Sequence, residues 1–106
     1  MRIAVLSDIH GNLPALRAVQ ADMARRGVDQ VINCGDILSG PLWPRETGDA
    51  LMALGWPAIA GNHERQLLAC ARRSGGPSDQ FAFEHTTPAQ RDWLAALPAT
   101  LEPTPG

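Results

Sequence analysis

The chain has 106 residues, of which 44% are hydrophobic, and 9 basic against 11 acidic residues give it a net charge of −2. This length and composition exclude a disordered chain and predict a single folded domain over residues 1–106. The slight acidic excess argues against a nucleic-acid groove. No apolar run approaches the roughly 18 residues that cross a membrane. Cys34 and Cys70 form no C-x-x-C pair, so we expect a reduced, cytoplasmic protein.

The first half of the chain alternates apolar runs with an amphipathic segment. Residues 2–7 are continuous and mostly apolar, which is typical of a strand buried on both faces. Apolar residues at steps of three and four then predict a helix that follows the cap Asn12 and ends at Gly27. Residues 30–34 predict a second strand, and the stretch 37–44, broken by glycine and proline, predicts a loop.

The second half continues this alternation. The pattern predicts a helix over 45–54, a short third strand over 57–60 and another helix over 64–73. Residues 74–79 indicate a loop, and a helix over 88–97 follows the cap Thr87. The stretch from residue 99 can begin a strand before its final turn-forming residues.

Strands that alternate with helices predict a βαβαβ topology, an α/β fold with a parallel sheet and right-handed connections. In open α/β sheets, ligands bind beyond the carboxyl ends of the strands. The residues directly after each predicted strand are therefore the first place to look for a functional site.

Residues with metal-ligand chemistry follow each of the three predicted strands. Asp8 and His10 follow the first strand, Asp36 the second, and Asn62 and His63 the third. Because neighbouring strands lie roughly 4.8 Å apart, side chains from these ends can converge on one ion. A set of carboxylate, amide and imidazole groups suits Mn, Fe or Zn better than Ca, and it lacks the thiolates of a structural zinc site.

Each of these residues also has an ordinary structural interpretation. Asp36 alone fits a turn former or a helix cap, and His10 alone fits a surface or hydrogen-bonded histidine. Asn62 alone fits the N-cap of the following helix. The metal-site hypothesis depends on finding ligand types at all three strand ends at once.

Three segments carry a resemblance to a known family: S-D-I-H-G-N (residues 7–12), G-D-I-L-S-G-P (35–41) and G-N-H-E (61–64). In this order, each separated by one helix, they resemble the motifs of the metallophosphoesterase (calcineurin-like) superfamily, in particular its small single-domain phosphodiesterases. The resemblance implies a four-layer α/β/β/α sandwich. This chain would hold its βαβαβ half, without the second sheet and its motifs, so we expect a C-terminally truncated domain.

The resemblance also implies a function: hydrolysis of phosphodiester or phosphomonoester bonds in small molecules by a hydroxide that bridges two divalent cations. Asp8 and His10 would bind the first ion. Asp36 would bridge both ions, and Asn62 would bind the second. His63 would face the phosphate and assist the leaving oxygen or stabilise developing charge. Mn is the expected metal, with Fe, Zn, Ni or Co as alternatives.

The later histidine ligands of the family pattern, one separate His and a G-H-x-H motif, have no counterpart in this chain. Besides His10 and His63 the chain contains only His85, which we interpret as a surface or capping residue. We therefore expect weak metal binding by an isolated monomer, with a second copy of the chain as a possible partner that covers the missing half. The alternative function is a weakly active or inactive binding or scaffold module of this fold. A metal-free nucleotide-binding domain is disfavoured because the chain has no phosphate-cradling glycine loop.

Overall fold

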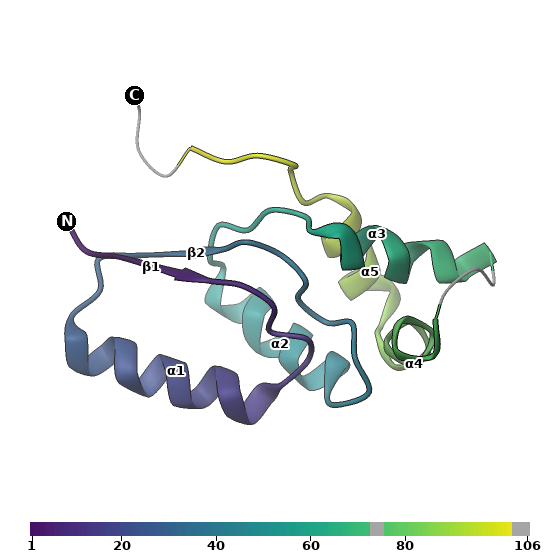
Figure 1. Cartoon of the computed structure of the whole chain (residues 1–106), viewed down its shortest axis with the longest axis horizontal. Coiled ribbons are helices and arrows are strands. Elements are labelled where there is room, and N and C mark those ends of the chain that lie inside the picture. Colours follow the sequence, from purple (N-terminus) through teal and green to yellow (C-terminus); the bar gives the residue numbers. More distant parts are fainter. Residues whose placement is uncertain (73–75, 103–106) are drawn as a thin grey trace.

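The structure is a computed structural model that describes residues 1–72 and 76–102 (Figure 1). Its strands are β1 (Ile3–Leu6) and β2 (Gln30–Asn33), connected by helix α1 (Leu13–Arg26). The helices that follow are α2 (Pro44–Leu54), α3 (Asn62–Ala69), the short 3-10 helix η1 (Cys70–Arg72), α4 (Pro77–His85) and α5 (Pro88–Ala95). In Figure 1, α1 and α2 lie on the same side of the strands, and α3, α4 and α5 gather near the end to which the strands point.

β1 and β2 pair in parallel, with Ile3 opposite Gln30 and Leu6 opposite Asn33. This confirms the predicted βαβ arrangement. A third segment runs beside β2: the Asn33 N–H donates to the Pro57 carbonyl at 2.9 Å, and the Ile59 N–H donates to the Asn33 carbonyl at 2.9 Å.

The predicted third strand over 57–60 is wrong in extent, because this segment forms only one parallel bridge, between Asn33 and Ala58. Pro57 has no N–H to donate to a ladder. The Ala60 N–H donates to the carbonyl of Pro98 at 2.9 Å, and α3 begins at Asn62. Too few residues remain between Pro57 and α3 for a regular strand.

Helix α1 begins and ends as predicted. The Asn12 side chain accepts a hydrogen bond from the Ala15 N–H at 3.2 Å, which caps the first turn. Gly27 ends the helix in the left-handed conformation at φ 68°. On its apolar side Leu16 is buried, whereas Val19 keeps 40% of its surface exposed.

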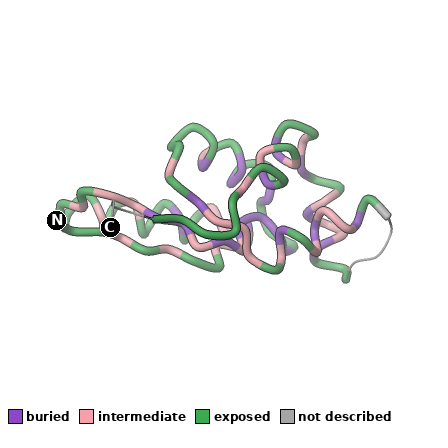
Figure 2. The backbone as a smooth tube through the Cα atoms, turned by 90° about the horizontal axis from the view of Figure 1, so that it is seen from above, coloured by how far each residue is buried: buried purple, intermediate pink, exposed green. Residues whose placement is uncertain are grey.

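The hydrophobic core lies toward the helices α2 to α5. Figure 2 shows that buried residues gather in the part of the molecule away from the two termini. The buried core cluster comprises Leu16, Ile37, Leu38, Leu51, Ala58, Leu67, Ala82 and Leu94. Ile37 and Leu38 have no exposed surface. The segment after β2 is a loop, as predicted, and its side chains form part of the core.

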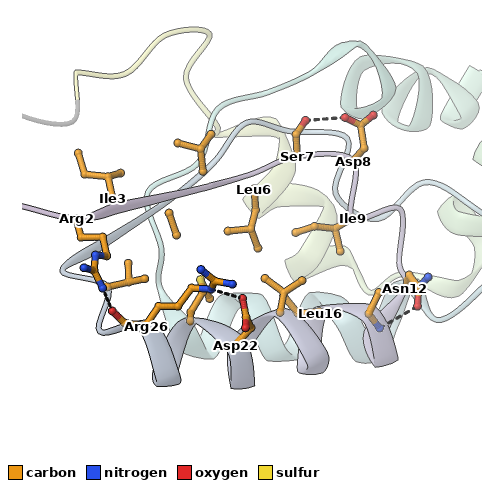
Figure 3. A pocket seen from close by; sticks show the side chains of 16 residues that line it. Arg2, Ile3, Leu6, Ser7, Asp8, Ile9, Asn12, Leu16, Asp22 and Arg26 are labelled. Carbon is orange, nitrogen blue, oxygen red and sulfur yellow. Dashed lines mark hydrogen bonds and ion pairs between the residues drawn. The ribbon is translucent and has the colours of Figure 1, made fainter.

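One face of β1 is open to solvent. Ala4 and Leu6 are half-buried, whereas 38% of Ile3 and 66% of Val5 is exposed. Figure 3 shows Leu6 and Leu16 directed toward one another between β1 and α1, where a cavity of about 550 Å³ lies. The prediction that residues 2–7 are buried on both faces is therefore wrong, because the described helices cover only the α1 side of this strand.

The predicted helices of the second half need two corrections. The helix predicted over 64–73 is the α-helix α3 over Asn62–Ala69, followed by the 3-10 helix η1, and Gly61 rather than Asn62 is its N-cap. The segment predicted as a loop over 74–79 already contains the first turn of α4 from Pro77, and residues 73–75 lie outside the described residues. Pro77 at the first helical position has a suitable φ and needs no N–H acceptor there, so a residue typical of loops begins a helix.

Helix α5 follows its predicted cap. The Thr87 hydroxyl accepts a hydrogen bond from the Gln90 N–H at 3.1 Å, and the Gln90 side chain accepts one from the Thr87 N–H at 3.0 Å. Residues 99–102 form no strand, and 103–106 lie outside the described residues. Across residues 1–72 and 76–102, no helix combines the length and apolar character that a bilayer crossing requires.

Candidate metal centre

The loops that follow β1 and β2 are held side by side by backbone hydrogen bonds. The Asp8 N–H donates to the Gly35 carbonyl at 3.1 Å, and the His10 N–H donates to the Asp36 carbonyl at 3.0 Å. The Gly11 N–H donates to the Ile37 carbonyl at 2.8 Å. These bonds extend the parallel pairing beyond the strands, so the residues of the two loops keep a fixed register.

Three of the predicted ligands meet at this edge of the sheet. Asp8, His10 and Asp36 each present one ligand atom, and these atoms all lie within 4.8 Å of one another. Metal–ligand distances of roughly 2.0–2.2 Å place two donors of one ion up to about 4.4 Å apart. The observed spacing is close to that limit, and two carboxylates with one imidazole form a donor set that fits a divalent transition-metal ion.

The backbone at the same three residues is strained. Among the described residues, Asp8 (φ 59°), His10 (φ 49°) and Asp36 (φ 56°) are the only non-glycine residues with positive φ. This conformation costs about 1–2 kcal/mol for each residue. Since strain of this kind gathers where a fold aims functional side chains, its coincidence with the three clustered residues supports a site here.

The imidazole of His10 is oriented by a backbone carbonyl. Its Nδ1 lies 2.8 Å from the Ser39 carbonyl oxygen, which can only accept a hydrogen bond, so Nδ1 carries the proton. The lone pair is then on Nε2, which lies 3.4 Å from the Asp8 carboxylate. An imidazole fixed through one nitrogen by a carbonyl is a common arrangement for metal-binding histidine. Ser39 had no role in the sequence prediction.

Asp8 is the exposed member of the set. Its Oδ2 accepts a hydrogen bond from the Ser7 hydroxyl at 2.7 Å. This bond is the main cause that lowers the pKa of Asp8; burial opposes it, and the interactions with His10 and Asp36 lower the pKa further. The carboxyl group is therefore anionic at neutral pH, as a metal ligand must be.

Asp36 connects the second loop to the start of α3. Its Oδ1 accepts a hydrogen bond from the His63 N–H at 3.0 Å. A Cβ on Gly61 would lie 2.5 Å from this oxygen, and a Cβ on Gly35 would lie 2.5 Å from the Gly61 nitrogen. The two loops touch backbone to backbone here, which only glycine permits. Asn62 lies between Gly61 and His63 at the start of α3 and is exposed.

The sequence interpretation missed the role of Glu64. This carboxylate is 2% exposed, and its Oε2 accepts hydrogen bonds from the N–H groups of Asp36 at 2.9 Å and Gly61 at 2.7 Å. Its Oε1 accepts a third from the Ile37 N–H at 2.6 Å. Glu64 thus joins the second and third loops. Its place at the third helical position, where a side chain can reach back to the N-cap, was the signal in the sequence.

His63 lies beside His10 at the edge of a small cavity. Its ring lies edge-on to the ring of His10, with 5.0 Å between centroids and 85° between planes. The two histidines help to line a cavity of about 270 Å³. The structure therefore brings four of the five predicted residues into direct proximity, and it places Asn62 next to them at the start of α3.

His85 lies apart from this cluster, as predicted. It is exposed in the last turn of α4, where its Nδ1 lies 2.8 Å from the Phe81 carbonyl oxygen and its ring stacks on that of Phe81 with 4.0 Å between centroids. Cys34 and Cys70 are free thiols.

Comparison with known proteins identifies the family of this chain. Residues 1–101 match the family model of the calcineurin-like phosphoesterases. Among curated proteins, the uncharacterized protein MJ0912 of Methanocaldococcus jannaschii is 39% identical over 66 residues, which are 62% of this chain and 27% of that protein.

Solved structures share the fold. A metallophosphoesterase from Sphaerobacter thermophilus superposes with a TM-score of 0.75 at 32% identity, over 92% of this chain and 41% of that one. A putative diadenosine tetraphosphatase superposes with a TM-score of 0.72 over 92% of this chain and 43% of that one, at 22% identity, and shows the likeness of fold alone. The chain thus spans less than half the length of these relatives.

Proposed function

Because the chain belongs to the calcineurin-like phosphoesterase family, we propose that it supplies the metal-binding edge of a metal-dependent phosphoesterase. The observation that carries this proposal is the convergence of Asp8, His10 and Asp36, whose ligand atoms lie within 4.8 Å of one another. Their positive φ angles and the Ser39 carbonyl that orients His10 support the same interpretation.

The residues would divide the work at the site. Asp8 and His10 would hold a first divalent ion, Asp36 would contribute its short carboxylate to both ions, and Asn62 would hold the second. Two such ions supply Lewis-acid polarisation of the phosphoryl oxygens and an activated water. His63, half-exposed on the cavity beside His10, is placed to give a proton to the leaving oxygen or to stabilise its charge. Mn is the metal we propose, with Fe, Zn, Ni or Co as alternatives.

The substrates we propose are small-molecule phosphodiesters or phosphomonoesters. Two ions need about ten to twelve donors, so the four proposed ligands leave positions for donors from outside the described residues, for instance from a second copy of the chain. A cytoplasmic location stays a prediction from the two unpaired cysteines.

The alternative function is a binding or scaffold module that keeps the fold without turnover. The observation in its favour is that the cluster of ionisable ligands among the described residues comprises only Asp8, His10 and Asp36. Under this alternative the site still binds metal, but phosphate esters are not hydrolysed.

The test combines metal content with activity in one sample. The purified chain is loaded with Mn, freed of excess metal, and assayed for hydrolysis of bis-p-nitrophenyl phosphate and p-nitrophenyl phosphate. Asp36→Ala is expected to lose bound metal and activity, whereas Asp92→Ala, an exposed aspartate on α5, is expected to match the wild type. Metal binding without hydrolysis in the wild type would favour the scaffold alternative. Equal metal content in Asp36→Ala and the wild type would contradict the proposed site.

A further inference from the structure

Asp79 is a buried carboxylate that neither the motifs nor the proposed ligand set uses. It lies in the first turn of α4, and only 7% of its surface is exposed. Burial of a carboxylate is costly unless a partner compensates the charge. Its Oδ1 lies 3.4 Å from Nδ1 of His63, so the imidazole is the partner that this carboxylate faces.

The position of Asp79 also has a simple helical explanation. An acidic residue in the first turn stabilises a helix through the partial positive charge of its N-terminus. Such a residue achieves this in full contact with water, and it needs no histidine partner. The burial of Asp79 and its approach to His63 are the two observations that this explanation leaves unaccounted for.

The contact determines which nitrogen of His63 is available to a ligand. A carboxylate opposite Nδ1 favours the tautomer with the proton on Nδ1 and leaves Nε2, on the other side of the ring, as the free nitrogen. His63 and Asp79 line the same cavity of about 270 Å³ as His10. The ring of His63 thus approaches Asp79 of α4 through Nδ1 and lies edge-on to the ring of His10.

We propose that Asp79 is a positioning residue that fixes the tautomer and orientation of His63. The proposal rests on the proposed function, in which His63 serves the leaving oxygen of a phosphate ester. Asp79 is not among the proposed metal ligands. It acts through His63 alone, by accepting the Nδ1 proton in a hydrogen bond.

The test reads the tautomer directly and needs no enzymatic activity. The chain has only three histidines, so nitrogen-15 NMR of the imidazole rings can assign each one in the metal-free protein at pH 8. We expect His63 to carry its proton on Nδ1 in the wild type and to shift toward the Nε2-protonated form in Asp79→Ala. His10 and His85, whose Nδ1 atoms face backbone carbonyls, should keep their signals.

Asp92→Ala, on the exposed face of α5, is the matched control and should leave all three rings unchanged. A His63 ring protonated on Nε2 in the wild type would overturn the proposal, even if Asp79→Ala fails to fold. An unchanged His63 signal in a folded Asp79→Ala would also overturn it.

A kinetic readout then separates positioning from a purely structural role. In the metal-loaded protein, kcat for bis-p-nitrophenyl phosphate should fall roughly 10- to 100-fold in Asp79→Ala while KM stays within about twofold. A rise in KM with unchanged kcat would contradict the proposed route through His63. Because the NMR measurement is made without substrate, a failure of the proposed phosphoesterase activity leaves the assignment of the His63 tautomer decidable.

Discussion

The loops at the carboxyl end of the sheet and the open face of β1 are neighbours in the chain, but they differ in the contacts that fix their structure. At the carboxyl end, Asp36 and its neighbours are fixed by backbone bonds, by buried residues and by the Glu64 carboxylate. On the open face, Val5 has 66% of its surface exposed. The chain therefore contains the contacts that shape its candidate site, whereas it leaves the apolar side chains of β1 uncovered.

The backbone strain at the candidate site explains why its loops need stabilising contacts. Three non-glycine residues at positive φ cost about 1–2 kcal/mol each, a large share of the stability of a small domain, which is roughly 5–15 kcal/mol. Hydrogen bonds from Asp8, His10 and Gly11 to the second loop offset part of this cost, and the fully buried Ile37 and Leu38 hold that loop in the core. The open face carries no comparable strain and has no comparable support.

Removal of the Glu64 charge should have a large effect on stability. In Glu64→Gln an NH₂ group replaces one oxygen of the carboxylate, and an NH₂ group cannot accept a hydrogen bond. The variant therefore loses either the bond from the Ile37 N–H or the two bonds from the N–H groups of Asp36 and Gly61. We expect the free energy of unfolding to fall by about 2–4 kcal/mol, measured by urea denaturation. Glu84→Gln, an exposed change on α4, should shift it by less than about 0.5 kcal/mol. Equal stability of the two variants would mean that Glu64 does not join the loops.

A methyl group on Gly61 should disturb the site more than the fold. The added Cβ would lie 2.5 Å from Asp36 Oδ1, so this carboxylate must move. We expect Gly61→Ala to weaken Mn binding about 10- to 100-fold, measured by isothermal titration. Gly76→Ala is the matched control, because a Cβ there meets no atom within 4 Å. Unchanged affinity in Gly61→Ala would show that Asp36 is not held against α3 in solution.

The sequence was sufficient for the parts of the fold that follow from local patterns. Periodic apolar residues and a cap predicted α1 between Asn12 and Gly27, and the cap Thr87 marked the start of α5. The clustering of Asp8, His10 and Asp36 was predictable because parallel strands deliver the residues after them to one edge. Their roles as ligands remain predictions.

The parts that the sequence did not reveal depend on contacts between distant segments. Glutamate is rarely buried, so the burial of Glu64 follows only from the backbone groups that meet around it. Asp79 lies on α4, whose first turn has a composition typical of loops, and nothing local connects it to His63. The third strand is reduced to a bridge because Pro57 removes a donor and Ala60 pairs with Pro98 instead.

A substitution on the open face of β1 tests whether this face contributes to the stability of the chain. Val5→Thr replaces a methyl group by a hydroxyl on a side chain that is largely exposed, so the free energy of unfolding should change by less than about 0.5 kcal/mol. Leu16→Ala, in the buried core, should cost about 2–5 kcal/mol by contrast. A large loss in Val5→Thr, together with a concentration-dependent sedimentation coefficient of the wild type, would mean that a second copy of the chain covers β1.

The reactivity of the two cysteine thiols tests the same difference in packing between the helices and the sheet. Cys70, at the end of α3, is 2% exposed, and burial is the main cause that raises the pKa of its thiol, with the charges of Asp79 and Glu84 adding to it. A raised pKa keeps this thiol protonated at pH 8, where the thiolate is the reactive form. Cys34, which directly follows β2, is only half-buried. We expect Ellman's reagent to modify Cys34 at least about tenfold faster than Cys70 in the folded chain, with Cys34→Ser as the control that isolates the slow thiol. Equal rates would mean that the helices around Cys70 open as readily as the sheet, and the difference in packing between the two regions would then not hold in solution.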